Sequence, residues 1–201
     1  EVLPPSEFPD EPRPEERLPA EAGMNRFAWD LRYEPPTKLP GVIYDEGRPL
    51  GALALPGAYQ VKLSVAAKSW TAPLEIKLDP RVTTSRADLE KQFELMTKLR
   101  DRQSQMNDAI LQMRDLRAQL QALRKRLARD LAAKSVLASA EELDKKMTPI
   151  EEEMIQVKTK ASEDELNYPT KLNSKLGYLQ GAVDSADTAP TRACFELFEE
   201  L

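Results

Sequence analysis

Few side chains in this chain have the types and spacing that catalysis requires. Its 201 residues include no histidine and a single cysteine, Cys194. Zinc sites, Cys/His nucleophilic pairs, an imidazole general base and internal disulfides are therefore excluded. Cys194 falls in an amphipathic helical pattern, which favours a small buried apolar residue over a reactive thiol.

Carboxylates are the remaining candidates for acid/base chemistry. Glycoside hydrolysis needs two of them about 5 to 10 Å apart across a sugar-sized cleft. The glutamates at 151–153 follow one another on a predicted helix, where neighbouring side chains point in different directions, and this indicates a solvated face. We interpret Asp30, beside Trp29 in a predicted strand, as a hydrogen-bonding residue at a turn or sheet edge. No Gly-rich phosphate-binding motif is present, so the sequence predicts no enzyme activity, metal or cofactor.

A basic cluster lies at Arg124–Arg129, whereas the whole chain carries a formal charge of −5. That net charge disfavours nucleic acids and anionic membranes as partners. The predicted helix that carries the cluster has no aromatic residue after Phe93, so it lacks a platform on which bases stack. We therefore expect the cluster to pair with an acidic helix. No apolar run approaches the ~20 residues that cross a bilayer, and the first residues lack the basic and apolar regions of a signal peptide.

The elements that position these groups change in character along the chain. Residues 1–22 hold six prolines among acidic residues, which predicts an extended linker or edge segment, with a proline-motif ligand as the alternative. Because the chain begins abruptly in this stretch and ends inside an amphipathic pattern, we expect it to be a piece of a longer protein.

Between residues 23 and 82, apolar residues alternate with polar ones, which is typical of strands with one buried face. Such stretches lie near 27–33, 42–44, 59–65 and 70–78. They predict four or five antiparallel strands in a small β-sandwich of the immunoglobulin or fibronectin type. A core of this size is marginal alone, so we expect the sandwich to lean on another part of the protein.

The aromatic residues of this region have two interpretations. Trp29, Tyr59 and Trp70 fall on the inward phase of the alternation, which favours a place in the sandwich core. The alternative is a carbohydrate-binding surface made of Tyr33, Tyr44 and Trp70.

After residue 83 the period changes to that of helices. If Gln103 fills the one gap, twelve steps cover the 42 residues from Leu89 to Leu131, an average spacing of 3.5. That spacing is typical of a helix packed lengthwise against others. The other members of this seam are Phe93, Met96, Leu99, Met106, Ile110, Met113, Leu116, Leu120, Leu123 and Leu127.

The predicted fold class is therefore α+β in two segregated domains, a β-sandwich at 23–82 and an antiparallel helical bundle at 83–201. Thr84 or Ser85 can cap the first helix of this bundle. Pro149 either kinks the second helix or makes it restart. The predicted helices span about 86–133, 136–163, 170–187 and 190–201.

Charges test how the first two helices pair. If they fold back near residue 134, positions whose numbers sum to about 268 face each other. This places Arg124 opposite Asp144, and Arg114 and Arg117 near Glu151. Opposite charges then meet along the rim of the helical hairpin, as expected for an antiparallel pair.

The first predicted helix is longer than the segments available to cover it. If part of residues 89–111 stays unpaired within the chain, a second chain should cover it and form a homodimer. The sequence therefore predicts an interaction seam made of Leu89, Phe93, Met96, Leu99, Met106 and Ile110.

Three stretches resemble a known family: residues 23–33 (GMNRFAWDLRY), 56–63 (PGAYQVKL) and 74–81 (LEIKLDPR). They resemble the C-terminal region of bacterial sortilin-like, BNR-repeat proteins, often labelled as glycosyl hydrolases, in which a β-propeller precedes a small immunoglobulin-like domain and a helical tail. The middle stretch is also similar to immunoglobulin-like modules of flagellar hook-capping proteins and secretion sorting domains.

The resemblance implies an accessory role. Any hydrolytic or sugar-binding activity in that family would belong to the propeller, so no catalytic residue carries over to this chain. The chain is then expected to be a non-catalytic assembly module of a larger exported protein, with the parent propeller as its partner. By analogy with the family, its location is the periplasm or the outside of the cell.

Overall fold

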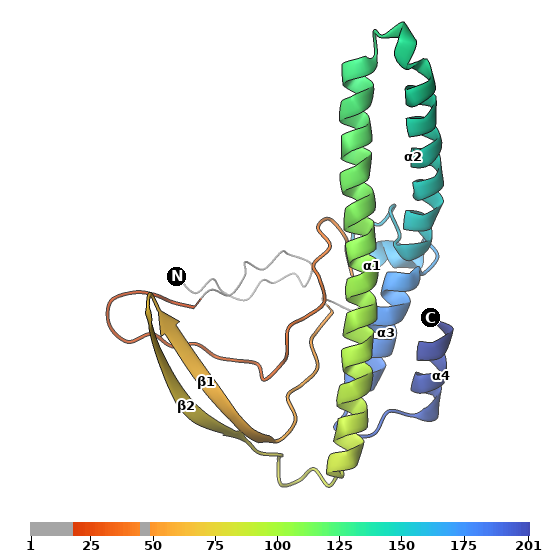
Figure 1. Ribbon diagram of the computed structural model, residues 1–201. Coiled ribbons are helices and arrows are strands. Elements are labelled where there is room, and N and C mark those ends of the chain that lie inside the picture. The colour runs from red at the N-terminus through yellow and green to blue at the C-terminus, as the bar shows by residue number, and fades with distance from the viewer. Residues whose placement is uncertain (1–17, 45–48) are drawn as a thin grey trace.

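The structure is a computed structural model that describes residues 18–44 and 49–201. Figure 1 shows a long helical hairpin beside shorter helices, with a two-stranded β-hairpin standing apart from them. The strands are β1 (Gly57–Val65) and β2 (Lys68–Ile76). The helices are α1 (Arg86–Leu127), α2 (Lys134–Met154), α3 (Leu172–Asp184) and α4 (Arg192–Glu200), with short 3₁₀ turns at Leu131–Ala133 and Ser162–Leu166.

The immunoglobulin- or fibronectin-like β-sandwich predicted for residues 23–82 is wrong. Among the described residues, the only sheet is the antiparallel pair β1–β2. The predicted strand near 27–33 is not part of a ladder: only Arg32 forms an isolated bridge, with Leu53, and Leu31 has a φ of 63° that interrupts the extended backbone. Alternation specifies which face of a strand is apolar, but it does not supply a neighbouring strand.

The helical pattern gave a more accurate result. Ser85 caps α1, because its side chain accepts a hydrogen bond from the backbone N–H of Asp88. Helix α2 continues through Pro149, so the predicted restart does not occur. Its ion pairs with α1 lie on both sides of the proline, at Asp144 and Glu151, and they hold the helix across the missing backbone hydrogen bond.

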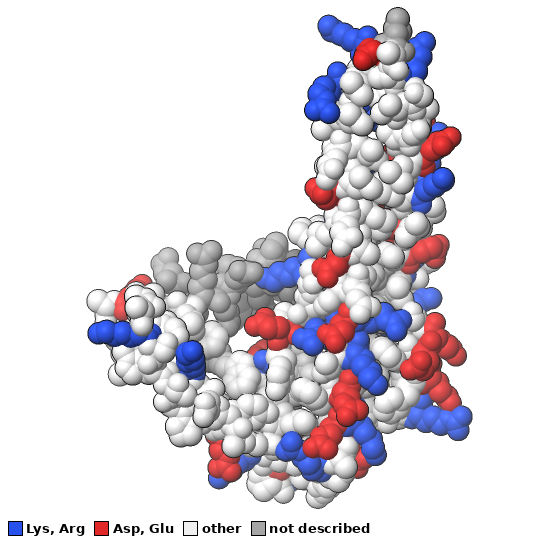
Figure 2. All heavy atoms as spheres, viewed as in Figure 1, with Lys and Arg blue, Asp and Glu red and all other residues white. Residues whose placement is uncertain are grey.

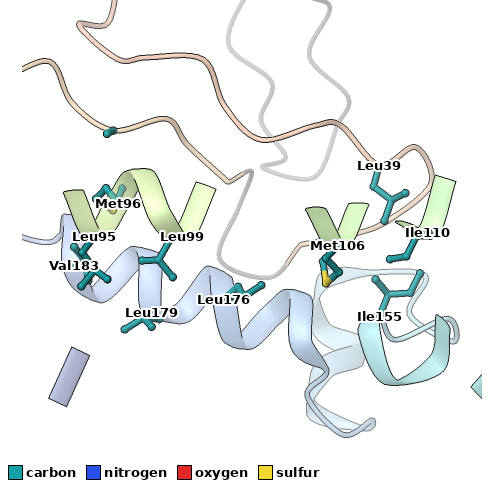
Figure 3. Close-up of a cluster of buried hydrophobic side chains, with 11 residues drawn as sticks. Leu39, Leu95, Met96, Leu99, Met106, Ile110, Ile155, Leu176, Leu179 and Val183 are labelled. Carbon is teal, nitrogen blue, oxygen red and sulfur yellow. The ribbon is translucent and has the colours of Figure 1, made fainter. Parts of the chain in front are cut away.

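The hydrophobic core surrounds the first half of α1. Figure 3 shows Leu95 and Leu99 facing Leu179 and Val183 of α3, with Leu176 next along that helix. At the other end of the cluster, Ile155 follows α2 directly, and Leu39 comes from the N-terminal part of the chain. The remaining members of the core are Ala52, Met96, Met106 and Ile110.

The described residues 31–44 and 49–55, here called the extended segment, lie against this helical core. Leu39 and Ala52 are 5% and 3% exposed and belong to the same cluster as α1 and α3. The N-terminal region is therefore not segregated from the helices, in contrast to the predicted arrangement of two domains.

A row of polar side chains on α1 holds the backbone of the extended segment. Asn107 donates to the carbonyl of Thr37 at 2.6 Å, and Ser104 accepts from the N–H of the same residue at 3.2 Å. Arg114 donates to the carbonyl of Pro40 at 2.9 Å. This side-chain pairing satisfies backbone groups that a sheet would otherwise satisfy.

Helix α3 holds the second half of the extended segment. The Gln180 amide accepts from the N–H of Leu50 at 3.1 Å and donates to its carbonyl at 2.6 Å, as a neighbouring strand would. Arg32 forms two hydrogen bonds with the Asp184 carboxylate, at 3.1 and 2.8 Å, and a third with the carbonyl of Gly51 at 3.1 Å. Three parts of the chain thus meet at the guanidinium of Arg32.

Gly51 is the tightest point of this contact. A Cβ atom at this position would lie 1.8 Å from the carbonyl oxygen of Tyr33, so the two backbones can approach only because glycine has no side chain. We expect Gly51→Ala to lower the free energy of unfolding by about 1–3 kcal/mol, as overpacking does. Chemical denaturation followed by circular dichroism measures this change.

Gly177→Ala is the matched control for this prediction. Gly177 lies inside α3, and apart from its chain neighbours and the nearby backbone of its own helix, no atom lies within 4 Å of an added Cβ. The same substitution should there raise stability by about 0.5–1 kcal/mol, because alanine favours helices. Equal effects of the two substitutions would contradict the close approach at Gly51.

Candidate interaction surfaces

The β1–β2 hairpin has one apolar face and one polar face. The register pairs Leu63 with Trp70, Val61 with Ala72 and Tyr59 with Leu74. Since alternate residues of a strand point to the same side, all the apolar members of these pairs share one face. We call this surface the hairpin face; its residues are Tyr59, Val61, Leu63, Val65, Trp70, Ala72, Leu74 and Ile76.

The outer half of the hairpin face is open to solvent. Val61, Leu63, Val65 and Trp70 are between 51% and 57% exposed. Figure 1 shows that this half projects away from the helices. A two-stranded sheet is marginally stable when nothing covers its apolar face. The hairpin therefore presents the kind of surface that marks a contact with another protein segment.

The base of the hairpin is fixed to the rest of the chain. The Tyr59 hydroxyl donates to the carbonyl of Leu55 at 2.7 Å, and Arg86 at the start of α1 donates to the carbonyl of Pro56. Leu74 and Ile76 are half-buried there. These contacts hold the open half at a defined position relative to α1.

Two further aromatic residues are exposed ahead of the extended segment. Phe27 is 49% exposed and Trp29 is 41% exposed. The indole N–H of Trp29 donates to the carbonyl of Arg32 at 2.9 Å, so the ring is held by a local hydrogen bond. Sequence reasoning placed Trp29 and Trp70 in a core, whereas both are open to solvent.

The three residues predicted as a carbohydrate-binding surface lie in different settings. The Tyr33 ring packs edge-to-face on Phe93 of α1, with ring centroids 5.2 Å apart. Tyr44 forms side-chain hydrogen bonds with Asn107 and Gln103, and burial raises its pKa. Trp70 lies on β2. Only Trp70 therefore presents more than half of its surface to solvent.

The predicted interaction seam lies inside the chain. Leu89, Met96, Leu99, Met106 and Ile110 are at most 6% exposed. Phe93 packs against this core and against Tyr33. The structure covers the stretch 89–111 with α3 and the extended segment, so these residues are not open to a second chain.

A polar cluster on α1 was missed by sequence reasoning. Asn107 is fully buried and Gln103 is 3% exposed, and both point toward the extended segment with hydrogen bonds to its groups. The signal was present as the gap at Gln103 in the apolar spacing. A polar residue at an otherwise apolar position of the spacing indicates that α1 forms hydrogen bonds there, and in the structure its partner is the extended segment.

The predicted pairing of charges between α1 and α2 is confirmed. Arg117 donates to Asp144 at 2.8 Å and to Glu151 at 2.6 Å, and Arg114 donates to Glu151 at 2.9 Å. Arg124 lies 4.0 Å from Asp144. A fold-back near residue 134 therefore gives the correct register.

These contacts shift the ionisation of Glu151. Burial raises the pKa of its carboxyl group, but hydrogen bonds from Arg117 and Arg114 favour the charged form more strongly, and the net pKa lies below the ordinary value. In turn, the hydrogen bonds that Arg117 donates to Glu151 and Asp144 raise the pKa of its guanidinium. The cluster is an ion-pair network that links two helices.

Other kinds of site receive no support from the described residues. In residues 18–44 and 49–201, no three Cys, Asp or Glu side chains are arranged to hold a metal ion. No helix in the same part of the chain combines the length and apolar character needed to cross a bilayer.

Comparison with known proteins found no family model, no curated protein and no solved structure that matches this chain.

The Glu151 network predicts an acid-sensitive helical hairpin. Because the folded-state pKa is lowered, the stabilisation is present above the ordinary carboxyl value of 4.5 and is lost as the pH falls through the lowered value. We expect Glu151→Gln to cost about 1–3 kcal/mol at neutral pH, since it weakens charge-assisted hydrogen bonds, and to flatten the stability profile on the acid side. Denaturation midpoints measured across the acid range check this.

Glu152→Gln is the control, because Glu152 is the next residue of α2 and is exposed. Its substitution should change neither the midpoint nor the pH profile appreciably. The same acid profile for wild type and Glu151→Gln would mean that the network does not link the helices.

Proposed function

We propose that this chain is a non-catalytic assembly module that docks another domain on its hairpin face. The observation that carries this proposal is the sided β1–β2 hairpin, whose apolar residues Val61, Leu63, Val65 and Trp70 are more than half exposed. Isolated exposed apolar residues are ordinary, but a contiguous apolar sheet face is typical of a contact surface.

The shape of the face favours a partner that is itself a β-sheet. Sheets pack face to face about 10 Å apart, with side chains interdigitating between them. A sheet laid on the hairpin face would bury the apolar side chains that are exposed there. In this proposal the second layer comes from outside the described chain.

The family resemblance suggests which domain supplies that layer. In the sortilin-like proteins a β-propeller precedes this region, and a propeller blade is an antiparallel sheet. We propose the propeller of the same exported polypeptide as the partner, with the periplasm or the outside of the cell as its location. The fixed base of the hairpin, through Arg86 and Tyr59, would hold the helices at a constant position relative to that partner.

Hydrogen exchange tests this docking directly. We expect the amides of β1 and β2 to exchange about tenfold more slowly in the complete polypeptide encoded by the gene than in this 201-residue chain, because a docked domain suppresses local opening. Leu63→Lys should remove the difference, since it places a charge on the hairpin face. Equal exchange in the two wild-type contexts would refute the docking.

Ser64→Lys is the matched control. Ser64 neighbours Leu63 on the polar face of the same strand, where its hydroxyl contacts that of Ser69 at 2.9 Å. The added charge should leave the slow exchange in the complete polypeptide intact. Loss of protection in both variants would point to damage to the hairpin itself.

The exposed Trp70 ring, at 54%, supports carbohydrate binding as a second candidate function. Aromatic rings present a flat apolar face on which sugar rings can stack. Calorimetric titration with a panel of polysaccharides should then give heat with wild type and with Tyr44→Ala, and none with Trp70→Ala. No heat with any polysaccharide excludes this function, and it leaves the docking proposal in place.

A further inference from the structure

The outer part of the α1–α2 hairpin has a second open apolar surface. On α2, Val136, Leu143 and Ile150 follow at intervals of seven residues and are 48%, 40% and 48% exposed. On α1, Leu116 and Leu123 have the same spacing and are half-buried. A spacing of seven places the members of each set on one side of their helix. These five residues are here called the apolar flank.

The two sets lie on the same side of the hairpin. In α1, Leu116 and Leu123 each precede an arginine of the ion-pair network, and in α2, Leu143 and Ile150 each precede one of its acids. Neighbouring helical residues are 100° apart. In both helices the apolar residue comes one position before the charged residue. Because the helices are antiparallel, this step rotates the apolar residue toward the same side of the hairpin in α1 and in α2. The apolar flank therefore lies about 100° around each helix from the ion pairs, on one side of the hairpin.

Figure 1 shows the outer parts of α1 and α2 running side by side beyond the other described helices. Figure 2 shows that the middle of this outer hairpin is largely uncharged on the face in view and that charged side chains lie along its edges. The core helices α3 and α4 lie beside the lower half of α1 and leave this part uncovered.

We propose that a second copy of this chain covers the apolar flank, so that two α1–α2 hairpins pack face to face, with their tips together, as a four-helix bundle. This inference is independent of the proposed docking on the hairpin face. The surface has the heptad spacing that coiled-coil and bundle partners share, and an identical hairpin supplies the same spacing.

Charge complementarity favours a second copy in this orientation. If a two-fold axis parallel to the hairpin relates the two copies, α1 of one copy packs against α2 of the other. A residue of α1 and a residue of α2 then lie at the same height when their numbers sum to 268. Arg126 then lies opposite Glu142 of the other copy, and the pair forms twice. Both residues are exposed, and neither has an ion-pair partner among the described residues. They border the flank, where charged residues commonly set partner and orientation.

The area of the flank is consistent with a dimer. Covering the five flank residues and their rims in two copies would bury on the order of 1,000 Å², which is near the lower bound of specific interfaces. An interface of that size predicts a dimer that dissociates on dilution, rather than an obligate one.

Sedimentation equilibrium of the whole chain tests the proposal. Wild type should shift from monomer to dimer between about 1 and 100 µM. The double variant L143K/I150K should weaken the association by about tenfold or more, because it buries charges in the interface. Both positions are exposed in the single chain, so unchanged helicity by circular dichroism is expected for the variant.

Leu63→Lys is the matched control, since Leu63 is 52% exposed but lies on the β1–β2 hairpin. It should leave the dimer intact. A strictly monomeric wild type would overturn the proposal, and so would a dimer that only Leu63→Lys disrupts. The second result would place self-association on the hairpin face.

A charge exchange tests the orientation. Arg126→Glu should weaken the dimer because it sets two acids against each other, and the double variant R126E/E142R should restore it. Failure of the second change to restore association would overturn the arrangement with tips together. Arg126 and Glu142 lie outside the hydrophobic core. Because Arg126 is a basic residue in the last turn of α1, circular dichroism of both variants is the control for folding.

Discussion

The covering of the first half of α1 is the constraint on which the rest of the structure depends. This stretch is apolar on more than one side, and its two partners come from opposite ends of the chain. Helix α3 contributes Leu176, Leu179 and Val183, and the extended segment contributes Leu39 and Ala52. Because burial of apolar surface is the main favourable term in folding, these contacts fix where both partners lie. Arg32 and Asp184 then join the two partners to each other.

The polar groups of this core explain why the N-terminal region does not form a sheet. At Thr37, Pro40 and Leu50, backbone groups of the extended segment obtain their hydrogen bonds from helix side chains, namely Asn107, Arg114 and Gln180. Near Arg32 and Leu53 the segment forms two backbone hydrogen bonds with itself. Once those groups are satisfied, no donor or acceptor is left to attract a neighbouring strand at the same positions. At these positions the chain uses helices where a sandwich would use a second strand, and no described strand covers the apolar face of β1–β2.

The helical hairpin is paired on one side and open on another. On one side Arg117 binds Asp144 and Glu151, which fixes the register and carries α2 across Pro149. About 100° around each helix lies the apolar flank, whose α2 residues are not covered by α1 and stay exposed. The open apolar surfaces of the β1–β2 hairpin and of the α1–α2 hairpin have the same origin: each element buries one side and has too few neighbours for the other.

The sequence by itself determined the local and helical features. A cap at Thr84 or Ser85, the fold-back near residue 134 and the pairing of Arg117 with Glu151 follow from spacing and charge alone, because their partners lie at offsets fixed by helix geometry. The structure has the cap at Ser85. Only the tertiary structure decided which surfaces stay open. Alternation in residues 59–76 specified an apolar face but not what covers it, and the seam at 89–111 is covered by residues 39 and 176–183, which no local pattern connects to it. Long-range contacts depend on the packing of the whole chain, so the β-sandwich and the partly unpaired helix were wrong where the cap and the register were right.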